Sequence, residues 1–213
     1  FTYNGKPQIP EAESPYAEIN VKGGGINAGT YTATAESKDP NYKVENSTHT
    51  YEIKKAENYW LAAPSIEAFY ESRSPSPSAT PYNGTPIFRY YSDESLTEEV
   101  SSFTHGIYYM VATVPESQNY LPLVSAPIAV EVLEVLPIDI RVEITSDLIA
   151  METLEKNDFI LYLLYNDGSE ALVQDGITIN YENADTLLHK DRTVQFLYSG
   201  FTKDILISVK KAT

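Results

Sequence analysis

The most concentrated carboxylates of this sequence lie in one short stretch. The pairs Asp93-Glu94 and Glu98-Glu99 flank a segment in which Ser95 and Glu98 have capping-box spacing, which predicts a short helix over residues 95–98. Calcium takes several oxygen ligands, so calcium binding is the chemistry that these acids would support. The candidate metal ligands are Asp93, Glu94, Glu98 and Glu99. The alternative, which we favour, is a solvated acidic loop in a chain that needs no cofactor.

Other metal patterns do not occur in the sequence. Asn166-Asp167-Gly168 lacks the ligand spacing of an EF-hand loop, and between two alternating segments it predicts a hairpin turn. His49, His105 and His189 lie far apart, and none has a second ligand at zinc spacing. Cysteine is absent, which excludes disulfides, thiolate zinc sites and cysteine nucleophiles.

No catalytic motif occurs either. The sequence has no nucleophile elbow, phosphate loop or dinucleotide-binding glycine pattern. The run Gly23-Gly24-Gly25 is not followed by the lysine and helix of a phosphate loop, so it predicts a wide or flexible turn. Nothing supplies a nucleophile, a base and an orienting group together, and we therefore expect this chain not to be an enzyme.

Aromatic side chains are the remaining binding candidates, because 17 residues are Tyr and one is Trp. Neighbours such as Tyr90-Tyr91 and Tyr108-Tyr109 face opposite sides of a strand, so one of each pair faces solvent. Exposed Tyr and Trp can stack on sugar rings or anchor a protein partner. The candidate ligand-binding residues are Tyr59, Trp60, Tyr90 and Tyr91. The alternative is packing between domains for Trp60 and ordinary surface positions for the tyrosines.

Charge and hydropathy limit the partners. The chain has 15 Lys and Arg against 30 Asp and Glu, a net charge of −15. Nucleic acid and anionic membrane both need a basic surface, so neither is an expected partner. A chain this acidic repels its own copies, which favours a monomer. No run approaches the roughly 20 apolar residues of a membrane span, so no membrane insertion is expected in this segment.

Side chains alternate with a period of two, which predicts an all-β chain. For example, Ile138, Ile140, Val142 and Ile144 are expected to share one face of a strand. Gly, Asn-Gly and Pro signals separate the alternating segments. The segments predicted as strands are 30–35, 48–53, 108–114, 128–132, 138–144, 159–165, 194–198 and 205–209.

The chain also repeats itself. Residues 28–35 followed by Asn41-Tyr42 return as residues 105–112 followed by Asn119-Tyr120, at an offset of 77–78 residues. Such a period indicates tandem copies of one small sandwich. Residues 137–213 do not fit the repeat and form a third unit. The predicted domains are residues 1–57, 58–135 and 136–213.

These residues carry a family resemblance. Residues 1–57 resemble the MBG-type bacterial immunoglobulin-like module through Tyr3-Asn4-Gly5-Lys6-Pro7 and residues 27–35, 40–42 and 51–56. Residues 58–135 resemble a second copy through Trp60 and residues 64–66, 88–93, 106–108 and 119–120. Residues 136–213 are similar to the group-three bacterial immunoglobulin-like domain through residues 165–169, 194–198 and Gly200.

The resemblance implies three tandem immunoglobulin-like β-sandwich modules in an elongated arrangement, the first of which lacks an opening strand that would precede Phe1. It also implies an extracellular or cell-wall location, with signal and anchor outside this segment. The expected function is a non-catalytic spacer or stalk with an adhesion role, whose partners are the neighbouring modules and host glycan or protein. The alternative is a carbohydrate- or protein-binding accessory module of a surface glycan-degrading enzyme.

Overall fold

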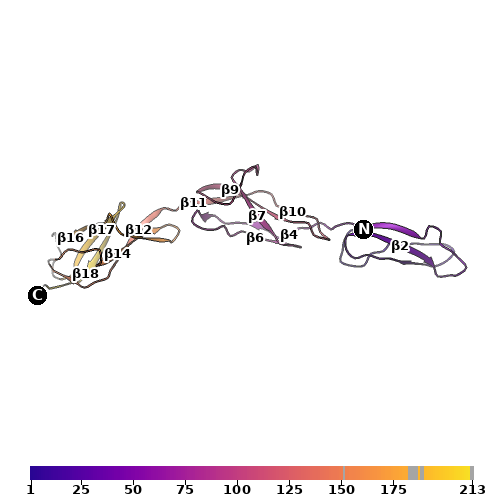
Figure 1. The fold of residues 1–213 in the computed structure, drawn as a ribbon, viewed down its shortest axis with the longest axis horizontal. Coiled ribbons are helices and arrows are strands. Elements are labelled where there is room, and N and C mark those ends of the chain that lie inside the picture. Colours follow the sequence, from indigo (N-terminus) through magenta and orange to yellow (C-terminus); the bar gives the residue numbers. More distant parts are fainter. Residues whose placement is uncertain (151, 182–186, 188–189, 212–213) are drawn as a thin grey trace. The chain divides into compact units, whose positions relative to one another are not determined.

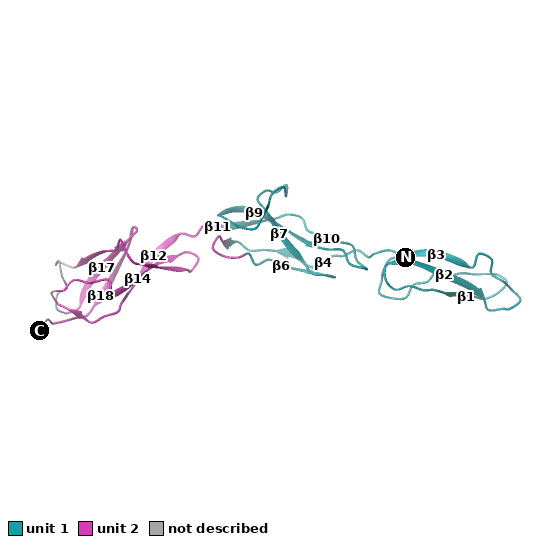
Figure 2. Ribbon diagram, in the orientation of Figure 1, with its two compact units in different colours: residues 1–69, 75–132 teal, residues 70–74, 133–213 magenta. Residues whose placement is uncertain are grey.

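The computed structural model describes residues 1–150, 152–181, 187 and 190–211, and within them it contains strands but no helix. The chain divides into two compact units (Figure 2). Unit 1 comprises Phe1–Phe69 and Pro75–Val132, and unit 2 comprises Tyr70–Ser74 and Leu133–Thr213. The prediction of an all-β chain is confirmed. Among the described residues, none lies in a helix that could cross a membrane.

The first part of unit 1 is a small antiparallel sheet (Figure 1). Its strand order is β1 (Ile19–Lys22), β2 (Gly29–Ser37) and β3 (Thr48–Ile53). The buried core consists of only three side chains, those of Ala33, Tyr51 and Ile53. Partly buried side chains pack against them, and these are Tyr3, Ile9, Val21 and Tyr31. With so little apolar area buried, this part of the chain depends on a few specific contacts.

Tyr51 makes the most important of these contacts. Its hydroxyl group donates to the carbonyl of Gln8 at 2.8 Å and accepts the N–H of Gly25 at 2.9 Å. It thereby joins the core of the sheet to residues in two loops. The run at residues 23–25 is therefore closely packed around aromatic side chains, and a Cβ on Gly25 would lie only 2.4 Å from the ring of Tyr31.

The second part of unit 1 is built from two sheets. One pairs β4 (Trp60–Ser65) with β6 (Ser78–Pro81). In the other, the order is β5 (Phe69–Tyr70), β11 (Ile128–Leu133), β9 (Gly106–Val114), β7 (Ile87–Tyr91) and β8 (Glu99–Val100), and β10 (Leu123–Val124) also pairs with β9. The buried side chains of β11 alternate, as Val130 and Val132, and those of β9 are Met110, Val111, Ala112 and Val114.

Unit 2 has two antiparallel three-stranded sheets that share one core. The first has the order β12 (Pro137–Ile144), β14 (Phe159–Tyr165) and β15 (Glu170–Val173). The second has the order β16 (Thr178–Tyr181), β17 (Arg192–Tyr198) and β18 (Phe201–Ile207). Phe159 and Phe196 meet in the core with ring centroids 5.0 Å apart. A short parallel pair, β13 (Leu148–Ile149) with β19 (Val209–Lys210), completes the unit.

Three local predictions are wrong. Residues 95–98 are not helical: a turn at residues 93–96 is closed by the Leu96 N–H and the Asp93 carbonyl, and Leu96 has a φ of +58°, which ends any helical path. The segment 205–209 is interrupted at Ser208, so that β18 ends at Ile207 and Val209 begins β19. Ile138 does not share the face of Ile140, because the register of β12 shifts between Pro137 and Asp139. Ile138 is 56% exposed whereas Ile140 is fully buried.

Among the described residues, the named strands pair only with strands of their own range: 19–53, 60–133 or 137–210. The division into compact units differs from the three predicted domains, because residues 1–57 fall in the same unit as most of residues 58–135. The immunoglobulin-like character of the modules stays a prediction.

Candidate functional site

Tyr59 and Trp60, two of the predicted ligand-binding residues, lie at the start of β4. Tyr59 is half exposed and stacks on Tyr82, with ring centroids 4.9 Å apart and an interplanar angle of 16°. Trp60 is partly buried and pairs with Pro81 of β6. Tyr59 is thus the more accessible of the two rings.

Tyr90 and Tyr91 point to opposite faces of β7, as neighbours on a strand must. Tyr90 is the register partner of the buried Met110 and contacts Phe103 edge-on at 5.2 Å. Desolvation in this position raises the pKa of Tyr90. Tyr91 is the register partner of Tyr109 on the other face, where both are partly exposed. Among the described residues, no ring contact joins Tyr90 or Tyr91 to Tyr59 or Trp60.

Tyr59 instead belongs to a row of four rings that we call the tyrosine ladder: Tyr3, Tyr120, Tyr82 and Tyr59. Tyr3 meets Tyr120 edge-on at 5.4 Å, and Tyr120 meets Tyr82 edge-on at 5.6 Å. Desolvation, followed by the hydrogen bond with Tyr82, raises the pKa of Tyr120. The ladder joins the first and second parts of unit 1. Its signals in the sequence are the repeated Asn-Tyr pair to which Tyr120 belongs and the identical Tyr-Asn-Gly triplets that Tyr3 and Tyr82 begin.

Backbone hydrogen bonds hold the connection between these two parts. The N–H of Ala56 donates to the carbonyl of Asn119 at 2.8 Å, and the N–H of Leu121 donates to the carbonyl of Ala56 at 2.9 Å. The side-chain oxygen of Asn119 also accepts the N–H of Ala28 at 2.8 Å. Asn119, the other member of the repeated pair, is therefore hydrogen-bonded both to the connection at Ala56 and to the first part of unit 1 at Ala28.

Asn58 is a buried polar residue that the sequence did not reveal. It is 7% exposed and follows the connection directly. Its amide nitrogen donates to the carbonyl of Asn83 at 2.9 Å, while its amide oxygen accepts the N–H groups of Asn83 at 3.2 Å and Tyr59 at 3.1 Å. Asn58 thereby holds the loop that carries Tyr82 against the start of β4.

The four candidate metal ligands take separate roles. Desolvation alone would raise the pKa of Asp93, but hydrogen bonds from Thr97 and Glu98 bring it below its ordinary value. Glu98 accepts a hydrogen bond from Ser92 at 3.0 Å, and Glu99 pairs with Arg89 at 3.0 Å. Glu94 is exposed. In the part of the chain that the structure describes, no group of three or more acids or histidines is placed to hold a metal ion. His189 lies outside the described residues.

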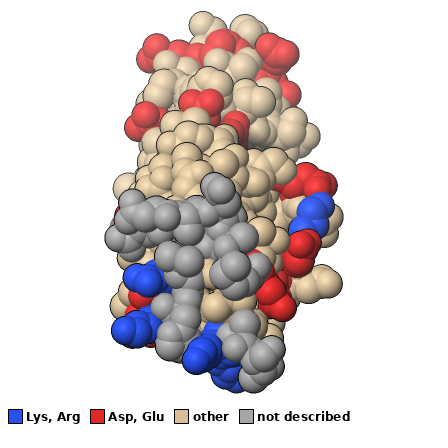
Figure 3. Space-filling view, turned by 90° about the vertical axis from the view of Figure 1, so that its left-hand side faces the viewer, with Lys and Arg blue, Asp and Glu red and all other residues tan. Residues whose placement is uncertain are grey.

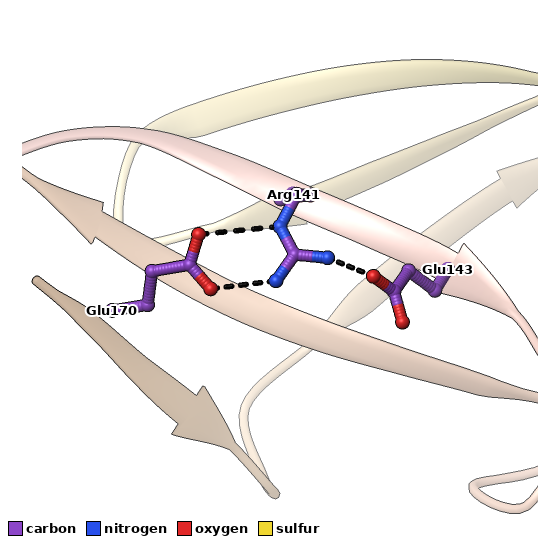
Figure 4. Close-up of polar contacts among 3 residues, drawn as sticks. All are labelled: Arg141, Glu143 and Glu170. Carbon is purple, nitrogen blue, oxygen red and sulfur yellow. Dashed lines mark hydrogen bonds and ion pairs between the residues drawn. The ribbon is translucent and has the colours of Figure 1, made fainter. Parts of the chain in front are cut away.

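In unit 2, Arg141 organises the outer face of the first sheet (Figure 4). It binds Glu170 of β15 with two nitrogens, at 2.6 and 3.4 Å, and it also pairs with Glu143. Its guanidinium carbon lies 4.4 Å from the ring centre of Tyr162. The hydrogen bond with Glu170 is the main cause of the raised pKa of Arg141. Tyr162 and β15 are thus held in place from the β12 side.

A pocket of about 390 Å³ opens at the end of β15. Ile160, Tyr162 and Leu172 form its apolar part on the outer face of the sheet, and Phe159, Val173 and Ile177 continue it toward the core. Its polar groups are those of Gln174 and of the ion pair between Lys156 and Asp175. An apolar pocket of this volume with a few polar groups is typical of a ligand site.

Asp167, in the predicted hairpin turn between β14 and β15, has a strongly lowered pKa. Its carboxylate accepts hydrogen bonds from the hydroxyl groups of Ser169 at 2.5 Å and Ser72 at 2.6 Å, and these lower its pKa to about 2. Because the pKa is lowered on folding, these bonds stabilise unit 2 above about pH 4, and the stabilisation is lost as the pH falls through about 2.

We expect Ser72→Ala to raise the pKa of Asp167, because one of its two hydroxyl donors is removed. An NMR titration that follows the Asp167 carboxyl carbon measures this shift. The matched control is Ser74→Ala, which changes an exposed serine on the same short segment and should leave the titration of Asp167 unchanged. An unchanged pKa in Ser72→Ala would contradict the observed hydrogen bond.

No family model, curated protein or solved structure matches this chain. The structure by itself defines an all-β protein with several antiparallel sheets, consistent with β-sandwiches. The resemblance to bacterial immunoglobulin-like modules depends on the sequence motifs and stays a prediction.

Proposed function

We propose that this chain is a non-catalytic spacer segment of a bacterial cell-surface or secreted multimodular protein, with a role in adhesion. The observation that supports the proposal best is the connection within unit 1. A spacer must hold one module at a set orientation to the next. A linker whose backbone is hydrogen-bonded resists bending more than a flexible tether does. The bacterial origin and the surface location rest on the family resemblance.

The connection has the properties that a spacer needs. Ala56 is hydrogen-bonded through both its N–H and its carbonyl, so that the linker backbone has little freedom. Lys55 pairs with Glu116 at 2.8 Å, which adds a weak, exposed contact. The tyrosine ladder adds aromatic ring contacts between the two parts that the linker connects. Charge supports the proposal as well, because a net charge of −15 favours solubility, and acidic side chains gather at the top and the right-hand side of the face in Figure 3.

The test is whether residues 1–57 and 58–132 orient as one body in the full chain. We expect their residual dipolar couplings to fit a single alignment tensor. The double variant Asn119→Ala, Tyr120→Ala removes the hydrogen bond to Ala28 and two ring contacts of the ladder, and it should require two tensors. Tyr91→Ala is the control, since Tyr91 lies away from the connection on β7. Two independent tensors in the unsubstituted chain would refute a stiff connection.

A second candidate function is a carbohydrate- or protein-binding accessory module of a surface glycan-degrading enzyme. The stacked pair of Tyr59 and Tyr82 favours it, because each residue is 50% exposed and carries a flat aromatic ring. Glycan-array binding that Tyr59→Ala abolishes, and that Tyr16→Ala does not, would support this function. Tyr16 is the matched control because it is also exposed, at 74%, and stacks on a different ring, Tyr42.

A further inference from the structure

The first sheet of unit 2 ends in a strand with an open edge. Among the described strands, β15 pairs only with β14. The N–H of Tyr165 donates to the carbonyl of Ser169 at 3.0 Å, so Tyr165 and Ser169 are a hydrogen-bonded residue pair. Pairs alternate along an antiparallel ladder, so the N–H and C=O groups of Glu170 and Leu172 point away from β14. These two residues therefore offer a second strand two donors and two acceptors.

The side chain of Leu172 extends the same edge as an apolar surface. It is 56% exposed and lies opposite Tyr162 in the register, on the outer face. The pocket of about 390 Å³ adjoins it and contains both residues in its lining. A strand that paired with Leu172 would place alternate side chains on this face, beside the pocket. Backbone pairing and an adjoining side-chain pocket are together the features of β-strand addition.

The charges around the edge favour a basic occupant. The cations of the site are Arg141 and Lys156. Arg141 is paired with Glu143 and Glu170, and Lys156 is paired with Asp175. Carboxylates thus outnumber cations at the edge. Over unit 2 as a whole, the sequence has 15 acidic and 8 basic side chains, a balance of −7. A second copy of this chain would bring the same excess of acids, so self-pairing is disfavoured.

We propose that β15 and the adjoining pocket form a docking site for an extended segment of another polypeptide, in which an apolar and a basic residue stand two positions apart and so share one face of the strand. The segment pairs with the backbone of Glu170 and Leu172, and one of its apolar side chains enters the pocket beside Tyr162. The basic side chain two positions away lies on the same outer face, near Glu170. The bidentate contact of Arg141 with Glu170 positions the edge before the partner arrives. This inference uses unit 2 alone and is independent of the spacer proposal.

The test uses the full chain and a synthetic peptide of about eight residues in which Val and Lys alternate at every second position, with Thr between them, so that Val and Lys share one face. We expect the peptide to shift the amide NMR signals of Glu170 and Leu172 and to slow the hydrogen exchange of both amides. A peptide with Glu in place of Lys should bind at least about tenfold more weakly. N-methylation of alternate peptide backbone nitrogens should weaken binding by a similar factor, because it removes the strand hydrogen bonds.

Two variants of the chain locate the contact. Leu172→Pro removes an N–H that points away from β14, which an edge strand can tolerate, and it should weaken binding at least about tenfold. Leu206→Pro is the matched control, since Leu206 is 72% exposed on β18 of the other sheet. Equal binding of the Lys and Glu peptides, unchanged binding after N-methylation, or shifts that avoid Glu170 and Leu172 would each overturn the proposal. The experiments that compare peptides use the unsubstituted chain, so their outcome does not depend on whether a variant folds.

Discussion

Gly23→Ala should cost the first part of unit 1 about 3–5 kcal/mol of unfolding free energy, through backbone strain and overpacking together. Gly23 has a φ of +95°, which is unfavourable for any residue with a Cβ. A Cβ there would also lie 2.2 Å from the carbonyl oxygen of Thr32. That carbonyl belongs to β2, the central strand of the sheet, and so cannot move aside. The three-residue core at Ala33, Tyr51 and Ile53 has little stability to lose.

The matched control is Gly5→Ala in the same part of the chain. Gly5 also has a positive φ, +77°, but the nearest atom to an added Cβ is the Tyr3 hydroxyl at 3.9 Å. Only the strain of the positive φ applies there, and we expect a loss of about 1 kcal/mol of unfolding free energy. Native-state hydrogen exchange of the amides of β2 and β3 measures both changes. Similar losses for the two variants would contradict the close approach of Gly23 to Thr32.

The second large effect is expected at Asn58. Asn58→Leu removes the partners of the Asn83 N–H, the Asn83 carbonyl and the Tyr59 N–H at a position with 7% exposure. Each buried polar group left without a partner costs about 1–3 kcal/mol, although water that enters the site lowers the sum. We expect a loss of about 2–4 kcal/mol in the unfolding free energy of the second part of unit 1, measured by denaturant unfolding.

Asn58→Asp separates hydrogen bonding from packing. The carboxylate still accepts the two N–H groups, but it faces the carbonyl of Asn83 without a proton to donate. Protonation restores that donor, so the variant should be less destabilised at low pH than at neutral pH. Asn83→Asp is the control, because only the backbone of Asn83 contacts Asn58. A loss of stability in Asn58→Asp that does not change with pH would argue against the hydrogen bond to the carbonyl.

The strands were predictable because each has one buried face. Alternation in residues 159–165 identifies β14, and the structure buries Phe159, Leu161 and Leu163 as the pattern requires. Ile138 was not predictable, because a bulge moves a side chain to the other face without changing the sequence pattern. The helix predicted over residues 95–98 is wrong because the capping-box spacing of Ser95 and Glu98 does not reveal the turn at residues 93–96. Asp93, rather than Ser95, accepts the N–H groups of that segment.

The candidate sites were less predictable than the strands. Sequence reasoning selected adjacent aromatic residues, whereas the tyrosine ladder joins residues as far apart as Tyr3 and Tyr120. The glycine run predicts a wide or flexible turn, because nothing local shows that Tyr51 and Tyr31 pack against it. The pocket beside β15 gives no sequence signal, since its lining combines residues from two strands and two loops.

The sequence by itself determined that this is an acidic all-β protein without cysteine, because period-two alternation and composition depend on residues near one another in the chain. Only the tertiary structure decided which side chains meet: the ladder at the connection, the buried amide of Asn58, and the open edge of β15 beside its pocket. The physical reason is that strand pairing brings distant segments together. Small shifts in its register determine which face each side chain occupies.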